Sequence, residues 1–160
     1  MTVIDREKLS YRKCVGVMLR NKSGDVFVGQ RLDNKADAWQ MPQGGIDEGE
    51  EPEVAAFREL KEEIGTNNIE IIAKAGNWYS YDIPDFLIPK FWNGQFRGQT
   101  QMWFLAKFLG DDSEININTA EPEFRKWHWA SPDTLPNIIV PFKRDLYTAL
   151  LIEFKDHLKK

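Results

Sequence analysis

Hydrophobic residues along the chain gather in short runs that predict β-strands. The first two runs, residues 14–19 and 26–30, are separated by residues 21–24, whose sequence Asn-Lys-Ser-Gly has turn chemistry. We expect these two runs to form a hairpin. Further strands are predicted at residues 69–73, 78–81, 102–108 and 126–130.

Two longer segments predict helices. Residues 52–64 begin with Pro52, which suits a first helical position, and Gly65 is placed to end that helix. In residues 142–158 apolar side chains recur every four positions. They are Leu146, Leu150, Phe154 and Leu158. Strands flanked by helices indicate an α/β domain built in layers.

The segment between the predicted strands at 78–81 and 102–108 has no clear hydrophobic period. Residues 82–100 contain two prolines and two glycines, so we expect a long functional or insertion loop there. A chain of 160 residues fits a single domain, which we expect to cover residues 1–160.

Composition argues against a membrane or secreted protein. The longest apolar runs, such as residues 138–140, are far shorter than the ~20 residues that span a bilayer, and residues 1–10 contain no apolar signal region. Cys14 is the only cysteine, which excludes an intrachain disulfide and a thiolate metal cluster. We expect a soluble cytoplasmic protein, and no feature indicates an obligate protein partner.

Acidic residues are concentrated in one part of the chain. The formal net charge is −4, yet residues 47–63 hold eight acids against Arg58 and Lys61, and the remainder has 19 basic and 17 acidic residues. This distribution is typical of a cation site on a domain whose other surfaces tolerate phosphates. A solvated acidic helix is the alternative interpretation.

The acidic segment has a defined spacing. Gly44 is followed after five residues by Glu50, and after seven more by the sequence Arg58-Glu59-Leu60-Lys61-Glu62-Glu63-Ile64-Gly65. At about 100° per residue, Glu59, Glu62 and Glu63 fall within a ~100° arc of the predicted helix. We expect the opposite side to pack on the sheet through Val54, Phe57, Leu60 and Ile64.

Three carboxylates on one helix face favour a bound cation. Neighbouring like charges destabilise an isolated helix by a few tenths of a kcal/mol per pair, and a cation reverses that penalty. Oxygen ligands without cysteine or clustered histidine select hard cations. We therefore expect Mg²⁺, with Mn²⁺ or another divalent cation as a substitute.

This pattern resembles the Nudix box, with Thr66 as the one departure, where an apolar residue is usual. The resemblance implies an α/β/α sandwich with a mixed central sheet, and cleavage of a pyrophosphate bond in a phosphorylated nucleoside. It implies that Glu59, Glu62 and Glu63 hold the metal. It also implies that Arg58 braces the preceding loop through Glu50, and that Gly44 and Gly45 let the backbone turn tightly near the metal.

Stretches outside the box resemble the bacterial RNA pyrophosphohydrolases and, with them, the asymmetrically cleaving dinucleoside polyphosphate hydrolases. They lie within residues 11–158, the core of the expected domain, at positions 11–12, 39–47, 98–104, 122–129 and 142–145. The resemblance implies conversion of 5′-triphosphorylated or diphosphorylated RNA to 5′-monophosphorylated RNA, and asymmetric cleavage of dinucleoside polyphosphates.

The same resemblance implies the residues of the substrate site. Arg12 and Lys143 would hold phosphates, Phe142 would stack on a base, and Gln99 would contact the end nucleotides. Glu123 is implied as a further metal ligand or as the base. The catalytic base remains open between Glu63, Glu62 and Glu123, because a base must lie within hydrogen-bond reach of the attacking water.

Three other functions remain open at this stage. A dedicated dinucleoside tetraphosphate hydrolase or an enzyme that clears small nucleotides would share the acidic helix and differ in substrate. A non-catalytic RNA- or nucleotide-binding module would be marked by lost metal ligands, whereas every box acid is present here. His128 and Cys14 are interpreted as structural residues.

Overall fold

The computed structural model describes residues 5–32 and 38–158. The expectation about a signal region falls partly on residues 1–4, and the expected domain 1–160 also includes 33–37 and 159–160; these residues lie outside the described part. None of the helices in the described segments has the length and apolar content needed to cross a bilayer. The strands and α-helices are β1 Ser10–Arg20, β2 Val26–Arg31, β3 Trp39–Gln40, β4 Gln43–Gly45, α1 Pro52–Ile64, β5 Ile69–Lys74, β6 Tyr79–Asp82, β7 Phe96–Phe108, β8 Phe124–Ala130, α2 Leu135–Ile138 and α3 Arg144–Glu153.

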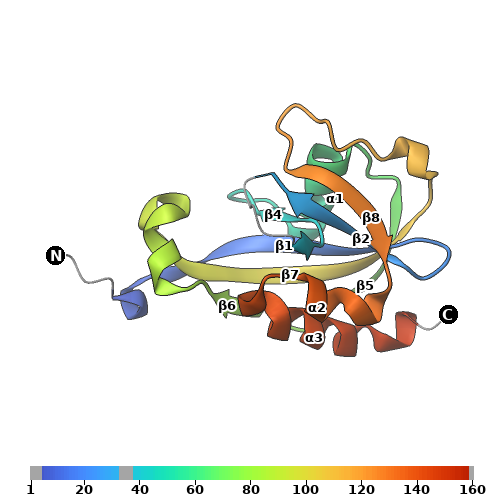
Figure 1. Cartoon of the computed structure of the whole chain (residues 1–160). Coiled ribbons are helices and arrows are strands. Elements are labelled where there is room, and N and C mark those ends of the chain that lie inside the picture. The colour runs from blue at the N-terminus through green and yellow to red at the C-terminus, as the bar shows by residue number, and fades with distance from the viewer. Residues whose placement is uncertain (1–4, 33–37, 159–160) are drawn as a thin grey trace.

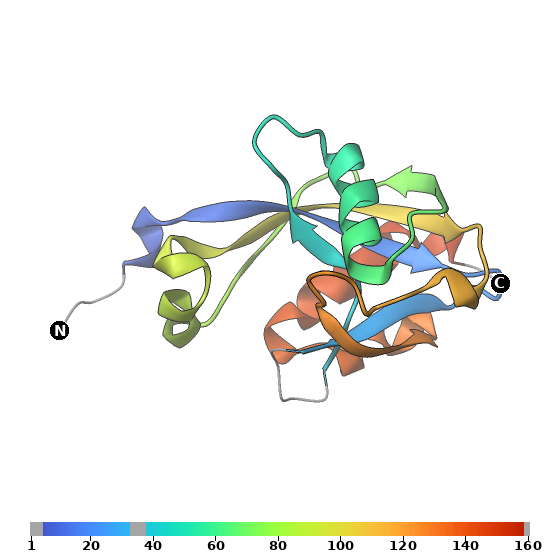
Figure 2. The same cartoon turned by 90° about the horizontal axis from the view of Figure 1, so that it is seen from above.

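The strands form one mixed sheet between two helical layers. The order β3-β2-β1-β7-β5 is extended by β4 on β1, β6 on β7 and β8 on β2. The long strands β1 and β7 run parallel, and the other pairs are antiparallel. Helix α1 covers one face of the sheet, and α2 and α3 cover the other (Figure 1). Figure 2 shows α1 lying across the strands on its face. The expected α/β/α sandwich is confirmed.

The central strands are buried on both faces because helices cover both. Residues 14–19 of β1 are all buried, so their side chains show no polar alternation. The largest fully buried side chains include Trp103 of β7, Phe27 of β2 and Tyr147 of α3, which belong to one hydrophobic core. This core fixes α1 and the sheet relative to each other.

The predicted hairpin is confirmed at its turn but not along its length. The Asn21 side chain accepts hydrogen bonds from the backbone N–H groups of Ser23 and Asp25, which closes the turn. Beyond the pair Arg20↔Val26 the two strands separate. Strand β2 then pairs with β3 and β8 instead.

The long loop predicted at residues 82–100 is wrong for much of its length. The segment holds 3-10 helices at Asp85–Lys90 and Trp92–Gly94, and β7 already begins at Phe96. The early part of β7 pairs with β6 and β1 despite its polar sequence. Hydrophobic periodicity missed it because its buried residues include two glutamines, Gln99 and Gln101.

The first predicted helix is confirmed and the second is shorter than predicted. Helix α1 ends at Gly65, whose φ of 78° is left-handed and whose N–H bonds to the Lys61 carbonyl. Helix α3 ends at Glu153, and Lys155–His157 continues as a 3-10 helix. Leu158, which follows this 3-10 turn, is partly buried against the core.

Candidate active site

The three box carboxylates of α1 are buried to different degrees. Glu63 is 4% exposed, whereas the side chains of Glu59 and Glu62 are 14% and 58% exposed. This order follows helical geometry, since Glu63, Glu59 and Glu62 lie about 60°, 100° and 160° from the inward-facing Leu60. The shared acidic face is confirmed, and it runs from the core out to solvent.

The predicted packing face of α1 is wrong at Val54. Val54 is 58% exposed, because it lies about 120° around the helix from Leu60, on the side away from Glu63. Leu60 and Ile64 are buried as predicted, and Phe57 is partly buried against the core. Ala55 and Ala56, both fully buried, complete the stripe. The face that packs on the sheet is therefore rotated toward Glu63.

Arg58 connects the acidic helix to the strand and loop before it. Its Nε and Nη2 donate to the two carboxylate oxygens of Glu50, each at 2.8 Å, and Nη2 also donates to the Gly45 carbonyl at 2.8 Å. Its Nη1 lies 3.0 Å from Glu59 Oε1 and 3.2 Å from Glu62 Oε2. The predicted pair with Glu50 is present, and it lowers the pKa of Glu50 from 4.5 to about 2.

Glu59 lies against the backbone of Gly44. A Cβ atom at Gly44 would overlap the Glu59 carboxylate, so a larger residue there would displace it. Gly44 and Gly45 both belong to strand β4 and neither has a left-handed φ, so the tight turn expected at these glycines is wrong. Burial raises the pKa of Glu59 from 4.5 to about 7, against the lowering effect of Arg58.

Glu63 is the most buried acid of the site. It accepts a hydrogen bond from the Gln43 backbone N–H, and Oε2 finds no partner among the residues that the structure describes. Burial raises the pKa of Glu63 well above its ordinary value, and the negative charges of Glu59 and Glu123 raise it further. A buried carboxylate oxygen without a partner favours a ligand at this position.

Two residues from outside α1 act electrostatically on Glu63. Glu123, which is exposed, precedes strand β8, and its backbone carbonyl accepts from the Leu32 N–H. Arg31, at the end of β2, lowers the pKa of Glu63. The structure thus brings Glu123 toward the box acids as predicted. Arg31 was missed, because no local pattern around a lone strand-end arginine indicates which element it faces.

Arg12 lies beside the second glycine of β4. A Cβ atom at Gly45 would overlap the Arg12 guanidinium, so this glycine is needed for close approach. Arg12 Nη1 donates to the Cys14 sulfur at 3.2 Å, and the thiol donates to the Arg12 carbonyl at 3.6 Å. Cys14 is fully buried, and burial raises the pKa of its thiol to about 11. Its prediction as a buried structural residue is confirmed.

Gln99 belongs to a buried hydrogen-bond network. Its Oε1 accepts from the Tyr81 hydroxyl at 2.8 Å, from Gln101 Nε2 at 2.7 Å and from Gln43 Nε2 at 3.5 Å. Gln101 Oε1 in turn accepts from Trp103 Nε1 at 2.9 Å. The network reaches the acids, because the backbone N–H of Gln43 donates to Glu63. None of Gln43, Tyr81 and Gln101 was predicted as a site residue, although Gln43 and Gln101 lie within the stretches 39–47 and 98–104 that carry the resemblance.

Phe142 and Lys143 lie next to Tyr81 on the opposite side of the sheet from α1. The Lys143 ammonium is 5.3 Å from the centre of the Tyr81 ring, and the Phe142 ring is 6.1 Å from it. Lys143 is only 4% exposed, and Phe142 is partly buried. Of the four residues predicted to bind substrate, Phe142 and Lys143 therefore border the hydrogen-bond network that contains Gln99.

The residues present fit a divalent cation, although within 5–32 and 38–158 no three acid, histidine or cysteine side chains converge as a ready metal cage. Glu59 and Glu62 instead bond to Arg58. Oε2 of Glu63, which has no partner among the described residues, is a hard oxygen donor for such a cation. A cation would also relieve the repulsion between Glu59 and Glu63. The residues that would hold it are Glu59, Glu62, Glu63 and Glu123.

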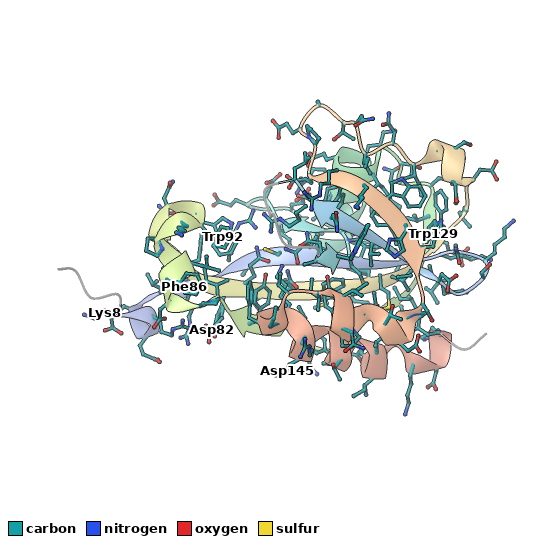
Figure 3. The ribbon with its side chains drawn as sticks, in the orientation of Figure 1. Lys8, Asp82, Phe86, Trp92, Trp129 and Asp145 are labelled. Atoms are coloured by element: carbon teal, nitrogen blue, oxygen red, sulfur yellow. The ribbon has the colours of Figure 1, made fainter. Side chains whose placement is uncertain are left out.

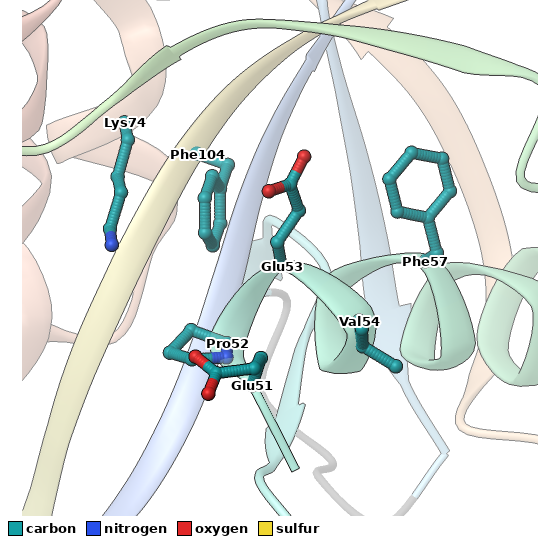
Figure 4. Close-up of a pocket in the computed structure, with 7 residues that line it drawn as sticks. All are labelled: Glu51, Pro52, Glu53, Val54, Phe57, Lys74 and Phe104. Atoms are coloured by element: carbon teal, nitrogen blue, oxygen red, sulfur yellow. The ribbon is translucent and has the colours of Figure 1, made fainter.

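A separate hollow lies at the other end of α1. Its volume is about 460 Å³, and it is lined by Glu51, Pro52, Glu53, Val54, Phe57, Lys74 and Phe104 (Figure 4). None of the box acids Glu59, Glu62 or Glu63 lines it. The two acids that line it, Glu51 and Glu53, are exposed. The hollow is therefore distinct from the acid cluster.

Comparisons with known proteins identify relatives along most of the chain. The chain is 58% identical over 147 residues to an RNA pyrophosphohydrolase of Rickettsia conorii (strain ATCC VR-613 / Malish 7), covering 92% of this chain and 91% of that protein. It is 56% identical to an RNA pyrophosphohydrolase of Rickettsia prowazekii (strain Madrid E) with the same coverage.

Solved structures show the same fold at low sequence identity. A C. elegans Ap4A hydrolase in a binary complex has a TM-score of 0.66 and 22% identity, covering 92% of this chain and 97% of that one. The E. coli dihydroneopterin triphosphate pyrophosphohydrolase has a TM-score of 0.64 and 20% identity, covering 89% and 98%. Residues 10–150 match the NUDIX domain. With the acidic helix, its arginine brace and this match together, the chain belongs to the Nudix family.

Proposed function

We propose that this protein is a divalent-cation-dependent pyrophosphohydrolase of RNA 5′ ends. It converts 5′-triphosphorylated or diphosphorylated RNA to 5′-monophosphorylated RNA, with release of pyrophosphate or phosphate, and it also cleaves dinucleoside polyphosphates asymmetrically. The observation that carries the proposal is the 58% identity to RNA pyrophosphohydrolases over 92% of the chain. The intact acidic face of α1 supports catalysis rather than binding alone.

The proposed reaction follows from the carboxylates of α1 and Glu123. Glu59, Glu62, Glu63 and Glu123 would hold a divalent cation, Mg²⁺ or a substitute such as Mn²⁺, and this cation would neutralise phosphate charge and activate water. Water attacks phosphorus, the bridging P–O bond between the first and second phosphates breaks, and pyrophosphate leaves. One carboxylate among Glu63, Glu62 and Glu123 accepts the water proton.

Arg58 acts through position rather than contact with the substrate. Its bidentate pair with Glu50 and its bond to the Gly45 carbonyl fix α1 against β4. Glu59 and the backbone of Gly44 then keep a constant separation. Gly65 contributes by ending the helix after Glu63, where its left-handed φ is required.

The residues proposed to hold the substrate come from separate elements. Arg12 on β1 and Lys143 before α3 provide the positive charges that bind phosphates. Phe142 supplies a ring on which a terminal base stacks. The side-chain oxygen Oε1 of Gln99 already accepts three hydrogen bonds. Gln99 would therefore contact the end nucleotides through its side-chain amide nitrogen.

We also propose that residues 1–160 form a single Nudix hydrolase domain with its core at 11–158, and that it works in the cytoplasm. One connected hydrophobic core joins all three layers in the described residues, which supports the first statement. The second follows from the proposed substrate, because RNA carries a 5′-triphosphate from its synthesis. A single buried cysteine is compatible with a reducing compartment.

A substrate panel tests the proposal. The protein is incubated with Mg²⁺ and separately with 5′-triphosphorylated RNA, diadenosine tetraphosphate and a nucleoside triphosphate, and products are resolved over time. We expect kcat/KM to be highest for the RNA, with 5′-monophosphorylated RNA as product. Preference for the dinucleotide would identify a dinucleoside tetraphosphate hydrolase, and preference for the mononucleotide would identify a nucleotide-clearing enzyme.

A further inference from the structure

The guanidinium of Arg12 is held by contacts from several elements. On one side it lies against the backbone of Gly45, where a Cβ atom would overlap it. Its Nη1 also donates to the buried sulfur of Cys14 at 3.2 Å. A long side chain with many rotamers is thereby restricted to few of them. These two contacts come from β4 and β1. A third side of the guanidinium faces another element.

Trp92 occupies that third side. The Arg12 Cζ atom lies 5.5 Å from the centre of the Trp92 ring, a separation at which a guanidinium is attracted to the ring face. Trp92 begins the second of two 3-10 segments between β6 and β7, which lie beside the start of the long central strands (Figure 3). The indole is itself supported by Phe91 at 5.5 Å and Phe96 at 6.1 Å.

The backbone at Trp92 is strained. Trp92 and Asn93 have φ values of 50° and 59°, and in the described residues they are the only non-glycine positions with positive φ. A left-handed conformation is rare for a bulky side chain, and it persists only where the surroundings impose it. Because such strain often occurs where a functional side chain must be held, the contact between Trp92 and Arg12 is a reason to retain it.

We propose that Trp92 is a positioning residue for Arg12. The ring supports the face of the guanidinium and leaves edge N–H donors to bind phosphate oxygens of the substrate. This inference rests on the proposed function, in which Arg12 binds phosphates. It adds the prediction that the segment between β6 and β7 takes part in substrate binding through Arg12 rather than by contact with the reacting atoms.

Steady-state kinetics with 5′-triphosphorylated RNA separate this role from a purely structural one. Trp92→Gly removes the ring and suits the left-handed backbone, so the segment keeps its conformation. We expect KM to rise about 2- to 30-fold, the range of a cation–π contact, with kcat within about twofold. Trp92→Phe should recover part of the loss. Asn93→Gly, the matched control, relieves the neighbouring strain and should change neither constant.

A double-mutant cycle tests whether the effect passes through Arg12. Binding of inorganic tripolyphosphate with Ca²⁺ is measured by calorimetry for the wild type, Arg12→Ala, Trp92→Gly and the double variant. We expect Trp92→Gly to weaken binding about 2- to 30-fold when Arg12 is present and less than about twofold in the Arg12→Ala background.

The outcomes separate this inference from the proposed function. Equal weakening in both backgrounds, no weakening, or no tripolyphosphate binding by the wild type would overturn the role of Trp92. A fall in kcat with unchanged KM would also overturn it. If the wild type binds tripolyphosphate with the expected coupling but does not process triphosphorylated RNA, the RNA substrate is wrong and the positioning role stands.

Discussion

At the scale of single residues, close approach determines what the site can do. Two adjacent glycines of β4 leave room for charged side chains. The Glu59 carboxylate lies against Gly44, and the Arg12 guanidinium lies against Gly45. Arg58 ties the same strand to α1 through the Gly45 carbonyl. The charges of the site are thereby fixed to one short piece of backbone.

Gly44→Ala should reduce turnover without unfolding the protein. The added methyl group displaces the Glu59 carboxylate, and a shift of about 1 Å in a catalytic group can cost on the order of 100-fold in rate. The rate is measured with triphosphorylated RNA, and folding is checked by thermal unfolding. Gly76→Ala is the control, because a Cβ there meets none of the described atoms within 4 Å. Full activity of Gly44→Ala would contradict the assignment of Glu59.

Glu50→Gln should make the protein less sensitive to acid while making it less stable at neutral pH. The Arg58 pair lowers the folded-state pKa of Glu50 to about 2, below its ordinary value of 4.5. Its stabilising contribution is therefore fully present above about pH 4.5 and is lost as pH falls toward about 2. Urea unfolding from pH 7 to pH 2 measures this. A stability difference from the wild type that does not shrink below pH 4.5 would argue against the pair.

The residues of the site differ in how far sequence could predict them. Glu59, Glu62 and Glu63 were predictable because the geometry of a helix fixes their relative directions. The Arg58–Glu50 pair followed from the family resemblance. Arg31 and Gln43 were not predictable, because each reaches Glu63 only through the way in which separate strands meet. A position that depends on tertiary contact has no local pattern.

At the scale of elements, burial of polar groups decided where the sequence-based predictions were wrong. The first half of β7 was missed because Gln99 and Gln101 are buried, with Gln101 donating a hydrogen bond to Gln99 Oε1. Strands β3 and β4 were missed because they are two and three residues long. In contrast, α1 was predicted with its bounds, since proline and glycine mark both ends.

Gly65→Ala should destabilise the fold at the end of α1. Its φ of 78° is left-handed, and a Cβ there would meet the Asn116 carbonyl oxygen at 2.9 Å. We expect a loss of about 1–2 kcal/mol, which lowers Tm by about 2–8 °C in a chain of this size. Differential scanning calorimetry measures it, with Gly76→Ala again as control. An unchanged Tm would show that the αL conformation is not required.

At the scale of the whole molecule, the residues of the proposed site come from distant parts of the chain. Strand β1 contributes Arg12, β4 the two glycines, and α1 the acids, while Glu123 precedes β8 and Lys143 precedes α3. The parallel pairing of β1 with β7 brings Gln99 beside Arg12. The α/β/α architecture was predictable from the resemblance. The separation of β2 from β1 was not predictable, because it depends on the pairing of β2 with the distant strand β8.

The most direct test of the account compares two glutamates of the same helix. Pyrophosphate and 5′-monophosphorylated RNA are quantified from triphosphorylated RNA and Mg²⁺ for the wild type, Glu63→Gln and Glu53→Gln. Glu63 is buried in the acid cluster, whereas Glu53 is exposed at the other end of α1. We predict that Glu63→Gln lowers kcat by about 100-fold or more with the fold intact, and that Glu53→Gln leaves it within about twofold. Equal activity of the two variants would contradict the account.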